Sequence, residues 1–120
     1  MSTITVTNIK ATGETATRAV SGVAAAWVHA DSTTSIYDSF NISTGTDNGT
    51  GDYSYSLSSA FTGANDYSQG SCVSGTAWQR QSQRNAARYT ASVIAINTGR
   101  TDTNVVSDQT HNITAHGDLA

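Results

Sequence analysis

The chain has 120 residues, a formal net charge of -3, only 12% charged residues and a single cysteine, Cys72. This length suits one domain, and the weak acidity excludes a general attraction for DNA or RNA. One cysteine excludes an intrachain disulfide framework and a zinc cluster built on thiolates. No segment is apolar over the length of a membrane span, and residues 1–6 lack the basic and apolar runs of a signal peptide. We therefore expect a protein made in the cytoplasm, with no membrane or nucleic-acid partner and no cofactor.

Two regions are predicted, an N-terminal arm over residues 1–20 and a domain over residues 21–120. Within the arm, residues 3–9 place threonines on one face and Ile4 and Val6 on the other. This alternation is typical of a half-buried or edge strand, which could pair with a neighbouring chain.

The domain begins with two apolar runs. Residues 20–30 fit either a short helix or a strand buried on both faces, and the β-rich surroundings favour the strand. Residues 35–42 alternate, but Asp38 interrupts the apolar face. We expect its carboxylate near a strand end or bonded to backbone N–H groups, because a buried charge needs partners.

The clearest local signal is the turn sequence of residues 47–52, Asp-Asn-Gly-Thr-Gly-Asp. An Asn-Gly pair tolerates the positive φ angles that a type I′ hairpin turn requires. Strict alternation of tyrosine and leucine with serine follows it. We therefore predict a hairpin that joins residues 36–43 to residues 52–58.

The second half continues with short β segments around one ambiguous stretch. Residues 67–73 predict a one-sided strand. Residues 76–88 fit one or two helical turns, with a capping box at their start, but the like charges repeated every fourth position repel, so an extended loop is equally open. Residues 89–97 predict a central strand that turns at residues 97–100. The final strand is expected within residues 105–115.

Short strands separated by turn signals, with no proline and no convincing long helix, predict an all-β fold. We expect an antiparallel β-sandwich or a jelly-roll-like domain that carries a short N-terminal arm. Its core is predicted to contain Trp27, Phe40, Tyr53 and Leu57.

Four segments resemble a recurrent domain of tailed-bacteriophage fibre and virion structural proteins. They are Ala26-Trp27-Val28, Asp38-Ser39-Phe40-Asn41, the hairpin from Thr46 to Tyr53, and Asn65-Asp66-Tyr67. The resemblance covers residues 24–70 well and the C-terminal third loosely, and the hairpin is its specific part. It implies a location in the virion, a homo-oligomer expected to be a trimer, and contact with other virion proteins or the host surface. It implies no catalytic residue.

Three functions follow from this interpretation. The first is a self-assembling structural module of tail-fibre or decoration type. The second is a carbohydrate-binding module that recognises a host surface glycan for attachment. The third is a capsid cement or decoration protein whose arm, residues 1–20, adds a strand to a capsid subunit.

Candidate binding residues cluster in the ambiguous stretch. Trp78 with Arg80, Arg84 and Arg88 combines an aromatic platform with guanidinium groups, which suits sugars, phosphates or acidic surfaces. The plainer interpretation is a packed tryptophan with solvated or intersubunit arginines.

Metal and catalytic sites find less support in the sequence. Oxygens of Asp47, Asn48 and Asp52 could surround Ca²⁺, but their spacing is not that of an EF-hand and the turn accounts for them. The histidines at 29, 111 and 116 lack the spacing of a metal site. No nucleophile elbow or ordered catalytic set of serine, histidine and aspartate occurs, so we expect no enzyme activity.

Overall fold

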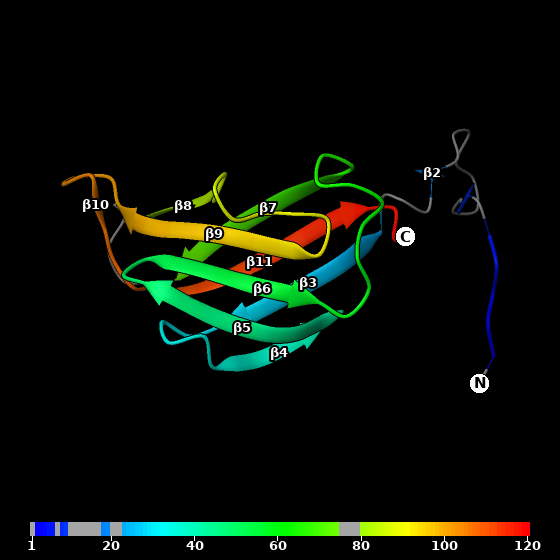
Figure 1. The fold of residues 1–120 in the computed structure, drawn as a ribbon, viewed down its shortest axis with the longest axis horizontal. Helices are drawn as coiled ribbons and strands as arrows, with labels where there is room; N and C mark the ends of the chain where they lie inside the picture. Colours follow the sequence, from blue (N-terminus) through cyan, green and yellow to red (C-terminus); the bar gives the residue numbers. More distant parts are fainter. Residues whose placement is uncertain (1, 7, 10–17, 20–22, 75–79) are drawn as a thin grey trace.

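The protein folds into two antiparallel β-sheets packed face to face, which confirms the predicted β-sandwich (Figure 1). The computed structural model describes residues 2–6, 8–9, 18–19, 23–74 and 80–120. None of these residues is helical, so this part of the chain has no helix that could cross a membrane.

The first sheet has four strands in the order β4-β3-β11-β7. These are β3 (Ala24–Ala30), β4 (Ile36–Phe40), β7 (Tyr67–Ser74) and β11 (Thr110–Gly117). The central strand β11 pairs with β3 on one side and with β7 on the other, in both cases antiparallel. The strand favoured over residues 20–30 is thus confirmed over residues 24–30, and the one-sided strand predicted over residues 67–73 is confirmed as β7.

The second sheet has five strands. Its strands are β5 (Ile42–Gly49), β6 (Asp52–Leu57), β8 (Arg80–Arg84), β9 (Val93–Arg100) and β10 (Val105–Val106). The order along the sheet is β5-β6-β9, and both β8 and β10 pair with β9. A separate two-stranded pair joins β1 (Asn8–Ile9) to β2 (Arg18–Ala19).

The core lies between the two sheets and consists of inward side chains of alternating residues. Its largest fully buried members are Tyr53, Tyr55, Phe61, Ile94, Ile96, Ile113 and Val28. Burial of Tyr53 and Leu57 confirms two of the four predicted core residues. Removal of this apolar surface from water is the main force that holds the sheets together.

Two other predicted core residues lie on the outer face instead. Trp27 pairs across strands with Phe40, and Phe40 is 53% exposed while Trp27 is half-buried. The reason is the twofold alternation of a strand: Val28 is buried between the sheets, so its neighbour Trp27 must point away from the core. The predictions of Trp27 and Phe40 as core residues are therefore wrong.

The predicted hairpin is confirmed for its second strand, β6, but its first strand is β5 rather than residues 36–43, because β4 pairs with β3 in the other sheet. Its turn also lies later than expected. Gly49 pairs with Asp52, so the two turn residues are Thr50 and Gly51, while Asn48 lies in a β-bulge. Gly51 has φ of 64°, and a Cβ there would collide with the carbonyl oxygen of Thr98. Only glycine fits this position without strain.

The strand expected over residues 36–43 is divided at Asn41, where the chain passes from one sheet to the other. Asn41 has φ of 60°, and its amide donates to the carbonyl oxygens of Ala25 and Ser59, at 3.1 and 2.9 Å. Its Oδ1 accepts from the Ser59 N–H at 2.7 Å. Asp38 accepts a hydrogen bond from the backbone N–H of Ser39 at 2.9 Å, as expected for its carboxylate.

Residues 80–84 form the edge strand β8, so the helical alternative is wrong for this segment, while residues 76–79 lie outside the described residues. The free edge of β9 supplies backbone partners for β8, and an extended chain separates the arginines that a helix would stack. A turn at residues 86–88 follows, β9 begins at Val93, and the chain reverses at residues 101–104 rather than at 97–100.

The strand predicted over residues 3–9 is confirmed only at Asn8–Ile9, which pairs with Arg18–Ala19 of the same chain. Residues 2–6 form no strand with the part of the chain that the structure describes. Figure 1 shows residues 2–6 apart from the sandwich, beyond the end at which the C-terminus lies.

Candidate functional site

Within the predicted cluster of Trp78 and three arginines, the side chains that the structure describes are those of Arg84 and Arg88. Trp78 lies outside the described residues, and Arg80 is the first residue of β8. The side chains of Arg84 and Arg88 make separate contacts with different partners, as described next. The sandwich therefore does not present them as a single binding face.

Arg84 is packed between two aromatic rings. Its guanidinium carbon lies 4.4 Å from the ring centroid of Tyr67 and 3.5 Å from that of Tyr89. Its Nη2 donates to the carbonyl oxygen of Ala64 at 2.8 Å. Stacking of this kind stabilises a partly desolvated cation, so Arg84 joins the loop of residues 62–66 to the 85–89 turn.

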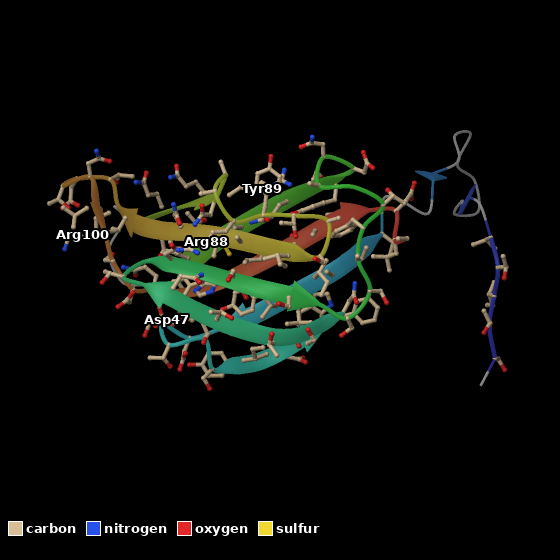
Figure 2. The ribbon with its side chains drawn as sticks, viewed as in Figure 1. Asp47, Arg88, Tyr89 and Arg100 are labelled. Atoms are coloured by element: carbon tan, nitrogen blue, oxygen red, sulfur yellow. The ribbon has the colours of Figure 1, made fainter. Side chains whose placement is uncertain are left out.

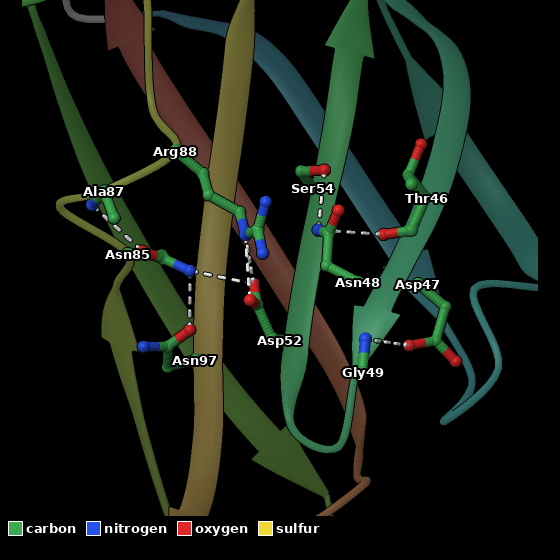
Figure 3. A network of polar contacts seen from close by, with 10 residues as sticks. All are labelled: Thr46, Asp47, Asn48, Gly49, Asp52, Ser54, Asn85, Ala87, Arg88 and Asn97. Atoms are coloured by element: carbon green, nitrogen blue, oxygen red, sulfur yellow. Dashed lines mark hydrogen bonds and ion pairs between the residues drawn. The ribbon is translucent and has the colours of Figure 1, made fainter.

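Arg88 belongs to a polar network on the outer face of the second sheet (Figure 3). Its Nε donates to the Asp52 carboxylate at 2.8 Å. Asn85, only 5% exposed, donates through Nδ2 to Asp52 at 2.8 Å and to the Asn97 Oδ1 at 2.7 Å. Its own Oδ1 accepts from the Ala87 N–H at 3.0 Å. The network fixes the 85–89 turn against β6 and β9.

A calcium site at this turn would need the Asp52 carboxylate as a ligand, but that carboxylate already has partners in the network. Asp52 is held by Arg88 and Asn85, and Asp47 accepts from the Gly49 N–H at 2.9 Å. Among the described residues, no three histidine, cysteine or acidic side chains are grouped as metal ligands would be. The turn chemistry accounts for these residues without a cation.

A cleft of about 90 Å³ lies beside the network, between β8 and the β9–β10 turn. Four amide side chains line it: Gln81, Gln83, Asn97 and Asn104. Gly99 forms part of its wall, and a Cβ there would press on the carbonyl oxygen of Val105 at 2.8 Å. Val105 and Val106 add an apolar side and are 55% and 54% exposed.

Arg100 and Arg88, two charged side chains that the structure describes beside the cleft and its network, are both paired. Arg100 donates to the Asp102 carboxylate at 2.6 Å, and Arg88 is bound to Asp52. Figure 2 places Arg100 at the end of the sandwich farthest from the N-terminal arm. The described side chains therefore make this cleft polar but electrically neutral.

An apolar groove of about 530 Å³ lies at the opposite end of the sandwich, where the arm leaves it. Its lining includes Val23, Phe40 and Leu119, which are 51%, 53% and 41% exposed. The start of β3 and residues 117–119 complete it. Adjoining exposed apolar side chains of this kind are typical of interaction surfaces.

A buried histidine connects the two sheets. His111 is fully buried, and its Nδ1 lies 2.7 Å from the carbonyl oxygen of Gln109, so Nδ1 must donate. Nε2, at 2.7 Å from the Tyr55 hydroxyl, then accepts. Burial lowers the pKa of His111 and raises that of Tyr55, so both are neutral. The third member of the cluster is Tyr53, whose ring stacks on His111 at 4.5 Å.

Helical spacing groups residues 80, 84 and 88 on one face, so it does not predict the amide cleft. The alternation Arg-Gln-Ser-Gln-Arg was the available signal, since it places Gln81 and Gln83 on one face of a strand. The groove could not be found without knowing that Phe40 faces outward. Comparison of the chain with protein-family models, curated proteins and solved structures found no match.

Proposed function

We propose that this chain is a nonenzymatic structural module of a tailed-bacteriophage virion, of tail-fibre or decoration type, that assembles as a homo-oligomer. The observation that supports the self-assembly is the apolar groove at the end of the sandwich, together with the exposed Ile4 and Val6 of the arm beyond that end. The virion assignment rests on the resemblance of the hairpin and its flanking strands to phage structural domains.

The arm has the properties of a docking segment. Ile4 is 85% exposed and Val6 is 45% exposed, and residues 2–6 contain no charged side chain. An extended chain directs Ile4 and Val6 to the same face, and burying them in a groove lined by Val23, Phe40 and Leu119 would remove apolar surface of both partners from water. We infer that the arm of one copy occupies the groove of the next, with a trimer as the expected assembly.

The solution mass of the full chain, measured by light scattering, tests this assembly. Ile4→Asp/Val6→Asp should convert the oligomer to a monomer, because two carboxylates would enter an apolar groove. Leu119→Asp should do the same from the groove side. The matched control is Thr3→Asp/Thr5→Asp, which adds equal charge to the other face of the arm and should leave the mass unchanged.

The outcomes separate the parts of the proposal. A monomeric wild type at all accessible concentrations would refute self-assembly. If the oligomer stays intact in Ile4→Asp/Val6→Asp as it does in the control Thr3→Asp/Thr5→Asp, the arm is refuted as the docking segment. Immunogold labelling of virions from the phage that encodes the chain tests the location, and unlabelled particles would refute the virion role.

A further inference from the structure

The amide cleft holds one side chain whose orientation is fixed. The Asn97 Oδ1 accepts from Asn85, so its NH₂ group must point the other way, and Figure 3 shows this nitrogen directed away from Asn85. No hydrogen bond within the described residues uses that NH₂ group. Because Asn97 lines the cleft, two oriented N–H donors are available to a ligand without reorganisation.

Three further amides surround this donor. Gln81 and Gln83 pair with Gly99 and Asn97 in register, so their side chains share the outer face of β8. Asn104 lies opposite them in the 101–104 turn. All three are exposed, and none of their side-chain amides forms a hydrogen bond with the part of the chain that the structure describes. An amide offers both donors and an acceptor, which matches the dual character of a hydroxyl group.

The charge pattern decides between ligand classes. Phosphate and nucleic-acid sites need unpaired cations, whereas the cationic side chains described there, Arg88 and Arg100, are bound to Asp52 and Asp102. A neutral ligand rich in hydroxyl groups would therefore lose less hydration free energy on binding here than an anion would. Val105 and Val106 supply an apolar wall, which suits the C–H face of a sugar ring.

We propose that the cleft between β8 and the β9–β10 turn binds a neutral saccharide, one sugar residue of a larger glycan. Asn97 donates the oriented hydrogen bonds, and Gln81, Gln83 and Asn104 bond the remaining hydroxyl groups. This site differs from the predicted cluster of Trp78 and arginines, and it does not depend on the proposed assembly.

The test is titration of the isotope-labelled full chain with methyl glycosides of glucose, galactose, mannose and N-acetylglucosamine, followed by NMR. At least one glycoside should shift the side-chain amide signals of Gln81, Gln83, Asn97 and Asn104, with a millimolar Kd. Gln81→Ala/Gln83→Ala should weaken that affinity at least about tenfold through two lost hydrogen bonds. Both residues are exposed and unbonded, so the variant should keep its fold, as judged by circular dichroism.

The matched control is Asn65→Ala/Asn112→Ala, which removes two amides outside the cleft and should leave the Kd unchanged. No shift with any of the four glycosides would overturn the proposal. Binding that survives in Gln81→Ala/Gln83→Ala would place the sugar elsewhere, and equal shifts with inorganic phosphate would refute the preference for a neutral ligand. The solution mass is measured independently, so failure here leaves the assembly standing and failure of the assembly leaves this site standing.

Discussion

Acid should destabilise this sandwich through one residue, His111. The neutral ring donates from Nδ1 to the Gln109 carbonyl oxygen and accepts at Nε2 from Tyr55. A proton on Nε2 would remove that acceptor and bury a charge at a site with no exposed surface. Burial therefore lowers the folded-state pKa of His111 below its usual value of 6.5.

The sign of the effect follows from proton linkage. The unfolded chain takes up a proton near pH 6.5, and the folded chain does so only at lower pH. Stability contributed by neutral His111 is therefore complete above that pH and is lost as the pH falls. The slope is at most about 1.4 kcal/mol per pH unit, or about 2 kcal/mol in total by pH 5.

Urea unfolding between about pH 7.5 and pH 5 measures this slope. His111→Gln removes the titrating ring and should flatten the dependence, whatever its effect on absolute stability. His29→Gln is the matched control, because His29 lies against the exposed Tyr37 ring at 4.9 Å rather than in the core. An equal slope in wild type and His111→Gln would refute the assignment to this residue.

Substitutions at three positions test the packing around the sheets, each by chemical unfolding against wild type. Tyr55→Phe should cost about 1–3 kcal/mol, because the buried Nε2 of His111 loses its donor; a loss below the error of measurement would contradict that bond. Gly51→Ala should cost at least about 2 kcal/mol, since it adds a Cβ at φ of 64° against the Thr98 carbonyl oxygen. Asn41→Gly should cost about 2 kcal/mol through lost hydrogen bonds, and Asn41→Ala about 1 kcal/mol more through its positive φ; the reverse order would show that backbone strain is absent.

The sandwich itself was predictable from the sequence because alternation and turn residues are local signals. The hairpin is the clearest case: alternation from Tyr53 to Leu57 placed β6 correctly. Its turn was misplaced by two residues, since both Asn48-Gly49 and Thr50-Gly51 offer the glycine that a tight turn needs. Thr50-Gly51 forms the turn because of the register between β5 and β6 and because Thr98 approaches Gly51 closely.

The orientation of whole strands required tertiary information. Residues 24–30 are apolar on both sides, so the sequence could not tell whether Trp27 or Val28 faces the core. The helical interpretation of residues 80–84 is wrong for a related reason, because it considers these residues alone and the edge of β9 that pairs with them lies outside the segment. The amide cleft depends on that edge, which is why it escaped prediction.

The groove and the cleft lie at opposite ends of the sandwich, since Figure 1 shows β10 at one end and the C-terminus at the other. An oligomer joined through the arm would thus keep several clefts open on one particle, and their combined binding would exceed that of one site. Ile4→Asp/Val6→Asp should leave the Kd for a methyl glycoside unchanged while lowering retention on a surface densely coated with that sugar by about 100-fold. Surface plasmon resonance on sparse and dense coatings measures the Kd of one site and the retention of the oligomer. The control is again Thr3→Asp/Thr5→Asp. An equal loss on the two coatings would mean that the arm acts on the cleft itself, and unchanged retention would mean that sugar binding gains nothing from assembly.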